Sequence, residues 1–465
     1  MEHGRFPIWT LAAVVAASAI LGLPVCRLLS PGWFRDNLWW IRALCLGVLF
    51  GWIVVRPAVV WLVERRRDTL AAPPSIGVSI VLPCHNVEAT LRDTVEGLLT
   101  QTHRPLEIIL VENGSTDGTR VLAERLADEY AEVRAASVQP SPTDYPVSVA
   151  TNVGVGMAKH PVILRLDDDT SLKQDAIARA LAELIASNAS AVACNLRIRN
   201  PDGSLWTRLQ AIEYLLAMDL DRRWQALFDS VICCSGAMSM FRRSAIIAAG
   251  GFVSAPRLMS EDMDMTLRAH ERGCVPVAPE AIGFTTVPTT LGDLLAQRAR
   301  WGASGTMSVY LHRHGIGRRA SWHSRWLGVV GLPLKLGIVV RELLGPVVLL
   351  DLWLLWANEG PRWLALMCAA HLGARGAQLA LLAPALARRD ARQGLRWWWL
   401  LPVLTFVYGP LIAVARCVGA WKGIRNIVEL RRRADVVERR GLVLRLADDD
   451  GAPVPELGYA ERVAR

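Results

Sequence analysis

Residues 77–83, GVSIVLP, form a short apolar run between turn residues and predict a buried β-strand. An amphipathic helix is expected over Ala89–Thr100, a second strand over Leu106–Val111 (LEIILV) and a third over Val162–Leu166 (VILRL), followed by a helix over Lys173–Ala186. Strands that alternate with helices predict an α/β domain with a parallel sheet covered on both faces. Ligands bind such sheets at the carboxyl ends of the strands, so the loops after these strands are where a site is expected.

The composition departs from that of an ordinary soluble protein. Of the 465 residues 52% are hydrophobic and only 20% are charged, which excludes a disordered or collagen-like chain. The formal net charge of +9 favours anionic lipid head groups as partners. A nucleic-acid partner is not expected, because no basic stripe with interleaved aromatics lies on a soluble segment. The nine cysteines include no C-x-x-C pair, so neither a zinc site nor a disulfide framework is indicated.

Several apolar runs have the length of membrane spans. Two precede the strand–helix region, and the basic cluster Glu64–Asp68 (ERRRD) follows the second, which predicts a cytoplasmic location for the residues after it. We therefore expect a multi-pass protein of the plasma (inner) membrane with a cytoplasmic α/β domain. The predicted runs are Pro7–Leu29, Leu38–Val63, Leu336–Trp356, Trp363–Leu386 and Trp397–Ala420.

These runs divide the chain into four predicted regions. They are an N-terminal transmembrane hairpin (1–68), the cytosolic α/β domain with interfacial helices at its end (69–315), C-terminal transmembrane or interfacial helices (316–420), and a basic then acidic tail (421–465).

Small or polar residues follow the first two strands, where each strand ends in a turn. They are Pro83, Cys84, His85 and Asn86 after the first, and the run ENGSTDGT (112–119) after the second. Such loops could hold a nucleotide base and ribose, or they could be surface turns stabilised by Asn, Gly and Ser side chains.

Three aspartates, Asp167, Asp168 and Asp169, end the third strand. Adjacent carboxylates repel one another unless a cation or a basic group neutralises them, and Mg²⁺ or Mn²⁺ favours carboxylates together with substrate phosphates. Asp167 and Asp169 point to the same side of an extended segment, so they could hold one metal on a diphosphate. The alternative is a solvated acidic turn or a helix N-cap.

Two further motifs lie nearer the C-terminus. The sequence Ser260-Glu261-Asp262 precedes a predicted helix and could supply a general base, although the helix dipole alone would also favour acids there. In the motif Q-x-x-R-W, Gln297 and Arg300 could meet phosphate oxygens and Trp301 could face a sugar ring. An interfacial helix would have a similar composition.

In this order and spacing the motifs resemble those of the membrane-bound family 2 glycosyltransferases, which include cellulose, hyaluronan, chitin and poly-N-acetylglucosamine synthases. The resemblance covers about Ser75 to Arg313, and the bacterial poly-N-acetylglucosamine type is the most similar. It rests on VSIVLPCHN (78–86), ENGSTDGT (112–119), the D-x-D of 167–169, SED (260–262) and Q-x-x-R-W (297–301), and on NLRIRN (195–200), QAIEY (210–214) and CSGAMSMFRRSA (234–245).

This resemblance implies a Rossmann-like, nucleotide-sugar-binding domain of the glycosyltransferase A type inserted between transmembrane helices. It further implies an inverting transfer of sugar from UDP-GlcNAc or UDP-glucose to the non-reducing end of a β-linked polysaccharide, which is then passed across the membrane. Accessory secretion subunits are possible partners. Two alternatives remain: an enzyme that adds one sugar to a membrane lipid, and a transporter or scaffold whose soluble domain only binds a nucleotide.

The resemblance also implies roles for single residues. Asp262 would be the general base, and Asp167 and Asp169 would bind the diphosphate through Mg²⁺ or Mn²⁺. The remaining donor contacts would come from Pro83, His85, Asn86, Glu112, Asn113, Gly114, Gln297 and Arg300, and the acceptor contacts from Ser235, Gly236, Glu261 and Trp301. Two positions depart from the family pattern: Asn113 stands where a second aspartate is usual, and Val147 or Pro146 where a lysine is common.

Overall fold

A computed structural model describes residues 51–64, 70–140, 145–254, 260–318, 323–324, 326–343, 361–387 and 392–438. The chain divides into two compact units, which we name the helical unit (1–69, 208–228 and 343–414) and the sheet unit (70–207, 229–342 and 415–465). The predicted N-terminal hairpin and acidic tail lie largely outside the described residues, so the four predicted regions stay a prediction.

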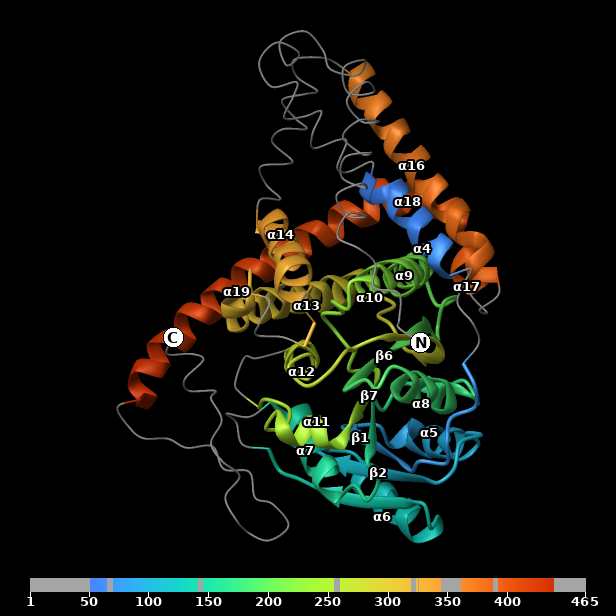
Figure 1. The fold of residues 1–465 in the computed structure, drawn as a ribbon, viewed down its shortest axis with the longest axis vertical. Coiled ribbons are helices and arrows are strands. Elements are labelled where there is room, and N and C mark those ends of the chain that lie inside the picture. Colours follow the sequence, from blue (N-terminus) through green and yellow to red (C-terminus); the bar gives the residue numbers. More distant parts are fainter. Residues whose placement is uncertain are drawn as a thin grey trace. The chain divides into compact units, whose positions relative to one another are not determined.

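An eight-stranded mixed sheet with the order β3-β2-β1-β4-β7-β6-β8-β5 forms the centre of the sheet unit (Figure 1). The strands β1, β2 and β4 confirm the three strands expected from the sequence. The bounds are β1 Val78–Cys84, β2 Leu106–Glu112, β3 Val133–Ser137, β4 Val162–Leu166, β5 Ser171–Leu172, β6 Ala191–Ile198, β7 Met238–Arg242 and β8 Val277–Thr285.

The expectation of a purely parallel sheet is wrong. Strands β3, β2, β1 and β4 are parallel, but β7 runs antiparallel to both β4 and β6, and β5 runs antiparallel to β8. A strand buried on both faces is apolar whichever way it runs, so the hydrophobic pattern predicts the strand and not its direction. The four parallel strands still bring the loops after β1, β2 and β4 to one edge.

Helices alternate with the strands along the chain, which confirms the predicted alternation. Helix α5 replaces the expected helix 89–100 with bounds one residue earlier, and α8 begins three residues after the expected start. The bounds are α5 Glu88–Leu99, α6 Thr119–Glu129, α7 Pro146–Met157, α8 Ala176–Ala186, α9 Leu205–Leu216, α11 Arg243–Ala248 and α12 Glu261–Ala269.

The last part of the sheet unit is helical. Its described elements are α13 Leu291–Leu311, η3 Arg313–Gly315, η4 Leu327–Gly331, α14 Leu332–Leu343 and, from residue 415 onward, α19 Gly409–Glu438. Helices α13 and α19 touch through small residues: a Cβ on Gly302 would lie 2.5 Å from the carbonyl oxygen of Arg416, and one on Gly419 only 2.1 Å from that of Ala299. Larger side chains at these two glycines would force the two backbones apart.

Of the helical stretches that the structure describes, Trp398–Glu429 is the one long and apolar enough to cross a membrane. Its second half belongs to α19 and packs on α13 as described above. A multi-pass arrangement therefore stays a prediction, supported in the described residues by this one stretch.

Ion pairs of two buried arginines join helices of the helical unit. Arg56 pairs with Asp221 at 2.6 Å, and the buried Arg223 pairs with Glu64 and, at 3.4 Å, with Asp219. The helices of this unit are η1 Gly51–Val55, α4 Arg56–Glu64, η2 Ala217–Asp221, α10 Arg222–Leu227, α16 Pro361–Ala387, α17 Arg392–Leu395, η5 Trp398–Leu400, α18 Leu401–Val403 and η6 Leu404–Tyr408.

Candidate active site

The loops after β1 and β2 are joined to each other by hydrogen bonds. Asn86 adopts a left-handed backbone (φ 55°), which asparagine tolerates better than most residues. Its Oδ1 accepts from the backbone N–H of Thr116 at 2.8 Å, and its own N–H donates to the hydroxyl of Ser115 at 3.1 Å. The two polar loops predicted from the sequence therefore form one continuous edge at the carboxyl ends of β1 and β2.

Glu112 and Asn113, both predicted to contact the donor, are buried at the end of β2. Glu112 accepts a hydrogen bond from the Ser137 hydroxyl at 2.6 Å and another from the Ser115 backbone N–H, and these bonds hold its pKa below the usual range. In this arrangement the buried Glu112 carboxylate holds the loop after β2 in place through its bond to Ser115. The side-chain oxygen of Asn113 is buried and has no hydrogen-bond partner within the described residues.

The three aspartates after β4 have three different environments. Asp167 forms a 2.7 Å ion pair with Arg165, Asp168 accepts from the backbone N–H of His85 at 3.1 Å, and Asp169 accepts from the hydroxyls of Thr170 and Thr285. Burial raises the pKa of Asp168 to about 6 and that of Asp169 in the same direction, and the neighbouring carboxylates add to both shifts. Asp168 thus joins the β4 carboxylates to the first polar loop.

Arg165 is the basic group that the three aspartates require. It lies on β4, is only 3% exposed, and its guanidinium contacts Asp167 at 2.7 Å and Glu261 at 3.6 Å. A Cβ on Gly236 would lie 2.2 Å from its Nη1, so only glycine leaves room for the guanidinium there. One buried cation therefore touches Asp167 of the D-x-D motif and Glu261 of the SED motif, and lies beside the glycine of the CSG segment.

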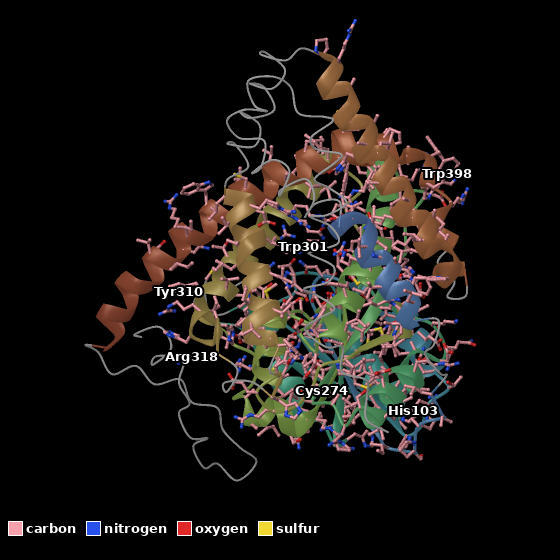
Figure 2. All side chains as sticks on the ribbon, turned by 45° about the horizontal axis from the view of Figure 1, so that its top comes forward. His103, Cys274, Trp301, Tyr310, Arg318 and Trp398 are labelled. Carbon is pink, nitrogen blue, oxygen red and sulfur yellow. The ribbon has the colours of Figure 1, made fainter. Side chains whose placement is uncertain are left out.

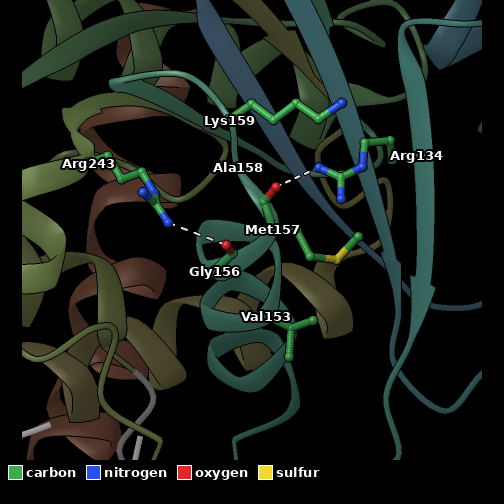
Figure 3. A pocket seen from close by; sticks show the side chains of 7 residues that line it. All are labelled: Arg134, Val153, Gly156, Met157, Ala158, Lys159 and Arg243. Carbon is green, nitrogen blue, oxygen red and sulfur yellow. Dashed lines mark hydrogen bonds between the residues drawn. The ribbon is translucent and has the colours of Figure 1, made fainter. Parts of the chain in front are cut away.

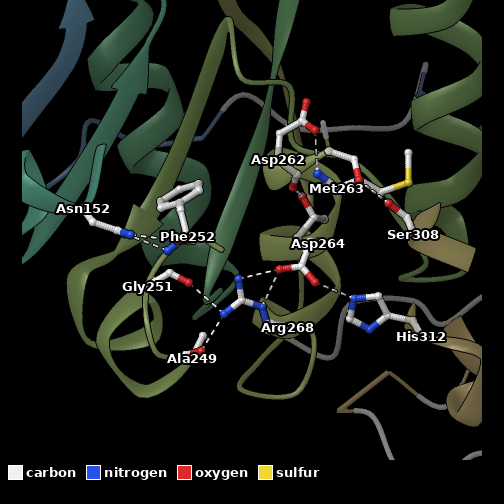
Figure 4. A network of polar contacts seen from close by, with 12 residues as sticks. Asn152, Ala249, Gly251, Phe252, Asp262, Met263, Asp264, Arg268, Ser308 and His312 are labelled. Carbon is white, nitrogen blue, oxygen red and sulfur yellow. Dashed lines mark hydrogen bonds and ion pairs between the residues drawn. The ribbon is translucent and has the colours of Figure 1, made fainter. Parts of the chain in front are cut away.

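Ser260, Glu261 and Asp262 point to three different elements from the start of α12. The Ser260 hydroxyl bonds to that of Ser308 on α13 at 2.8 Å, and Glu261 faces Arg165 on β4. The Asp262 carboxylate accepts from the backbone N–H of Gly236 at 3.2 Å and from that of Met263 at 2.7 Å (Figure 4). The three residues at the start of α12 therefore contact α13, the sheet and the segment before β7, respectively.

Burial raises the pKa of Glu261 to about 7, and the charge of Asp262 adds to the shift while Arg165 opposes it. The same carboxylates, together with burial, raise the pKa of Tyr145 well above its usual range. Tyr145 directly precedes α7, and the charges that act on its phenol are Glu261, Asp262, Arg165 and Asp167. These four charged groups and the phenol of Tyr145 form one cluster, which contains three carboxyl groups and one cation.

The Q-x-x-R-W motif lies in the first half of α13. Trp301 is 41% exposed (Figure 2). Its ring lies under the buried guanidinium of Arg298, whose Cζ is 4.0 Å from the ring centre. Arg298 also donates to the side-chain oxygen of Gln297, and Arg300 is exposed. In the structure Gln297 thus bonds to Arg298, the next residue of the helix. Its expected contact with a donor diphosphate stays a prediction.

The comparisons with known proteins agree with this geometry. Residues 79–249 match the sequence profile of Glycosyl transferase family 2. This chain carries a family 2 glycosyltransferase domain. The match includes β1, the loops after β1 and β2, the D-x-D carboxylates and β7, and it confirms the family expected from the motifs.

Two curated relatives of the glycosyltransferase match about half of its chain. The poly-beta-1,6-N-acetyl-D-glucosamine synthase of Staphylococcus aureus (strain COL) is 30% identical over 235 residues, 49% of this chain and 54% of the relative. An N-acetylglucosaminyltransferase of Mesorhizobium japonicum is 28% identical over 246 residues, 51% of this chain and 58% of the relative. The matched region thus spans little more than half the length of these relatives.

A solved structure is similar in fold. The mannosyltransferase PcManGT from Pyrobaculum calidifontis, in complex with GDP-Man and Mn²⁺, matches with a TM-score of 0.51 and 17% identity. The match covers 80% of the glycosyltransferase and 95% of that chain. It confirms the α/β fold of the glycosyltransferase A type.

Three residues near the cluster, Arg165, Lys335 and Tyr145, were not predicted from the sequence, although Arg165 carried a signal. Arg165 is the single charge in a strand that is otherwise apolar and fully buried, and a buried charge needs a partner. Lys335 on α14 approaches α13, where a Cβ on Gly305 would lie 2.9 Å from its Nζ. The nearby charged and titratable groups include Cys233 and Asp262. Tyr145 gave no signal, because it lies in an irregular loop.

A cavity of about 620 Å³ lies at the other end of α7 (Figure 3). Arg134, Lys159 and Arg243 line it, but both arginines donate to carbonyl oxygens at the C-terminal end of α7, those of Met157, Val155 and Gly156. These bonds satisfy the last carbonyls of the helix, which have no partner within it. The cavity contains none of the predicted site residues.

Proposed function

We propose that this protein is a membrane-integrated inverting glycosyltransferase that extends a β-linked polysaccharide. It takes sugar from a nucleotide sugar, UDP-GlcNAc or UDP-glucose, adds it to the non-reducing end of the chain, and passes the polymer across the membrane. The named activity of the staphylococcal relative supports the proposal that the product is a polymer. The apolar helical stretch Trp398–Glu429 supports the proposal that the protein is integrated in a membrane.

One observation carries the proposal: Arg165 bridges the D-x-D motif and the SED motif at 2.7 and 3.6 Å. Asp167 of the D-x-D motif therefore lies two side-chain contacts from Glu261, the residue directly before the candidate base Asp262. A single-displacement transfer needs this arrangement, because the acceptor hydroxyl must lose its proton while the nucleotide diphosphate departs on the opposite face.

Asp262 is assigned as the general base. The Gly236 N–H and the Cys233 thiol fix its Oδ2 at 3.2 and 3.5 Å, so the carboxylate has a defined orientation toward the CSG segment. The acceptor hydroxyl would donate its proton to this carboxylate. Glu261 directly precedes Asp262, and its carboxyl group pairs with Arg165, so it offsets part of the positive charge beside the base.

The carboxylates fit a divalent cation bound to a diphosphate. Within the described residues no group of three or more His, Cys, Asp or Glu side chains forms a metal site, which agrees with a cation that takes one or two carboxylates and completes its shell with phosphate oxygens. Asp169 is the better ligand, because its present partners are hydroxyls, whereas Asp167 already faces Arg165. When bound, Mg²⁺ or Mn²⁺ would neutralise the departing diphosphate.

Asn113 is suited to a nucleobase although it replaces the aspartate usual in the family. Its Oδ1 is a buried acceptor without a donor in the described part of the chain, and such a group is costly to leave unpaired. A ring N–H of uracil would supply that donor. This supports UDP as the nucleotide.

The test is turnover of nucleotide sugars by the purified full-length protein in lipid vesicles with Mg²⁺ or Mn²⁺. We expect UDP release from UDP-GlcNAc or UDP-glucose, and a polymer by gel filtration. Asp262→Asn should lower the turnover about 10²- to 10⁴-fold. Asp93→Asn, an exposed residue on α5, is the matched control and should leave it unchanged.

Each other result refutes a specific part of the proposal. If the product is a lipid that carries a single sugar, the protein glycosylates a lipid and does not synthesise a polymer. Turnover of none of the nucleotide sugars would refute transferase activity with these donors, and full activity of Asp262→Asn would refute the assignment of the base.

A further inference from the structure

Two side-chain contacts join the start of α12 to the end of α13. The Ser260 and Ser308 hydroxyls lie 2.8 Å apart, and His312 Nε2 lies 2.9 Å from Asp264 Oδ1. Ser260 and Asp264 are four residues apart, and so are Ser308 and His312. Residues four apart lie on one face of a helix, so the contacts are two successive rungs between facing helix surfaces, and we name this pair of rungs the two-rung clamp.

The first rung uses a residue that would ordinarily cap its own helix. Ser260 is the N-cap residue of α12, and serine is favoured there because its hydroxyl accepts from a backbone N–H one turn later. Here it makes no such bond, and its hydroxyl contacts Ser308 instead. Both serines are buried, so the contact is shielded from water.

In the second rung, Asp264 is also bonded to Arg268, on the side away from His312. Arg268 donates to Asp264 Oδ2 at 2.8 Å and also to the carbonyl oxygens of Ala249 and Gly251 at 2.6 and 2.7 Å (Figure 4). Asp264, Arg268 and His312 are all buried. Asp264 therefore has little freedom to move, and His312 is bound to a fixed partner.

The clamp encloses the residues that the proposed reaction needs. Glu261 and Asp262 lie between Ser260 and Asp264 in the chain. The opposite face of α12 is bonded to the segment before β7, through Asp262 to Gly236 and through Thr266 to Cys234 at 2.7 Å. Asp262 therefore lies on a turn of α12 that is bonded to α13 on one face and to the segment before β7 on the other.

The α13 side of the clamp continues into the Q-x-x-R-W motif. Gln297, Trp301, Ser308 and His312 follow one another at intervals of four, seven and four residues, which places all four on one face of α13. Trp301 lies seven residues before Ser308, or about 10 Å along the helix axis. The helix face that forms the clamp is therefore the face that presents Trp301.

We propose that the two-rung clamp is a positioning device that sets the distance between Asp262 and the acceptor sugar on Trp301. Ser260, Ser308, Asp264 and His312 are positioning residues in this sense. The inference rests on the proposed function, because it assumes that Asp262 and Trp301 serve one acceptor.

The first rung is tested by a double-mutant cycle in the full-length protein. Ser260→Ala and Ser308→Ala should each lower kcat for transfer about tenfold, with the donor KM and the Kd for UDP unchanged, because a small displacement of the base acts on the chemical step. The double variant should lose no more than either single variant. Ser187→Ala, at the end of α8, is the matched control and should keep the wild-type kcat.

The second rung is tested by a conservative replacement. His312→Gln keeps a side-chain N–H that can donate to Asp264 and should retain most of kcat, whereas His312→Ala should lose about tenfold. A residue with only a structural role would lower the melting temperature in both variants and leave kcat per folded molecule unchanged.

Amide hydrogen exchange gives a readout without turnover. Ser308→Ala should speed the exchange of the amides of 261–265, and Ser187→Ala should not. If the wild-type protein turns over no nucleotide sugar, the proposed function fails and exchange still tests the clamp. Losses that multiply in the double variant, unchanged kcat in both serine variants, or unchanged exchange would overturn the clamp.

Discussion

Replacing Gly236 with alanine should displace Arg165 from the candidate active site. The new Cβ would lie 2.2 Å from Nη1 and 2.9 Å from Cζ of a guanidinium that is only 3% exposed. The guanidinium must retreat by more than 1 Å to reach an ordinary van der Waals distance. It cannot do so and keep the 2.7 Å ion pair with Asp167.

Two magnitudes follow from this displacement. Overpacking of a buried site costs about 1–3 kcal/mol of unfolding free energy. A shift of about 1 Å in a group that orients the carboxylates lowers kcat about 10²-fold. Urea unfolding and UDP release, measured on the same preparation, report both. Gly97→Ala on α5 is the control, because a Cβ there meets nothing within 4 Å.

A second substitution shows whether the two residues act through each other. In an Arg165→Ala background the guanidinium is gone, so adding Gly236→Ala should cost no further stability and no further activity. Wild-type stability and kcat in Gly236→Ala, or fully additive losses in the double variant, would show that Arg165 does not occupy the space beside Gly236.

Three further outcomes follow from the site. Asp169→Ala should weaken UDP binding about tenfold in the presence of Mn²⁺ and not in its absence, by calorimetric titration. Trp301→Ala should lose sugar transfer and keep hydrolysis of the donor by water, whereas a membrane anchor would keep transfer per folded molecule. Burial raises the pKa of Glu261, so the stabilising effect of its proton is complete below about pH 4.5 and is lost as the pH rises through about 7. Glu261→Gln should therefore flatten the decline in the free energy of urea unfolding between these pH values.

The parallel half of the sheet was predictable because its strands are buried on both faces. Continuous apolar runs such as LEIILV stand out against the polar loops around them, and β1, β2 and β4 begin and end within one residue of the prediction. The direction of β7 was not predictable, since it depends on how the chain returns to the sheet after α9 and α10. Hydrophobic pattern carries no information about that path.

The motifs of the candidate site were predictable as motifs, but the partners of their side chains were not. Asp167 and Glu261 are far apart in the sequence and meet only because Arg165 lies between them in space. The sequence did show that three adjacent aspartates need a neutralising group, and the expectation was a metal ion or a basic group. The structure identifies a basic group two residues upstream, on the same strand.

The spacing of acids on α12 has a physical explanation in its two faces. Positions 260, 264 and 268 lie on one face, where Ser260 and Asp264 meet α13 and Arg268 bonds to the turn after α11. Positions 262 and 266 lie on the other face and bond to the segment before β7. A carboxylate at 264 therefore cannot substitute for one at 262, although the two are only two residues apart, because they point in nearly opposite directions. This is why Asp262 is the candidate base and Asp264, which is also acidic and more deeply buried, has a positioning role.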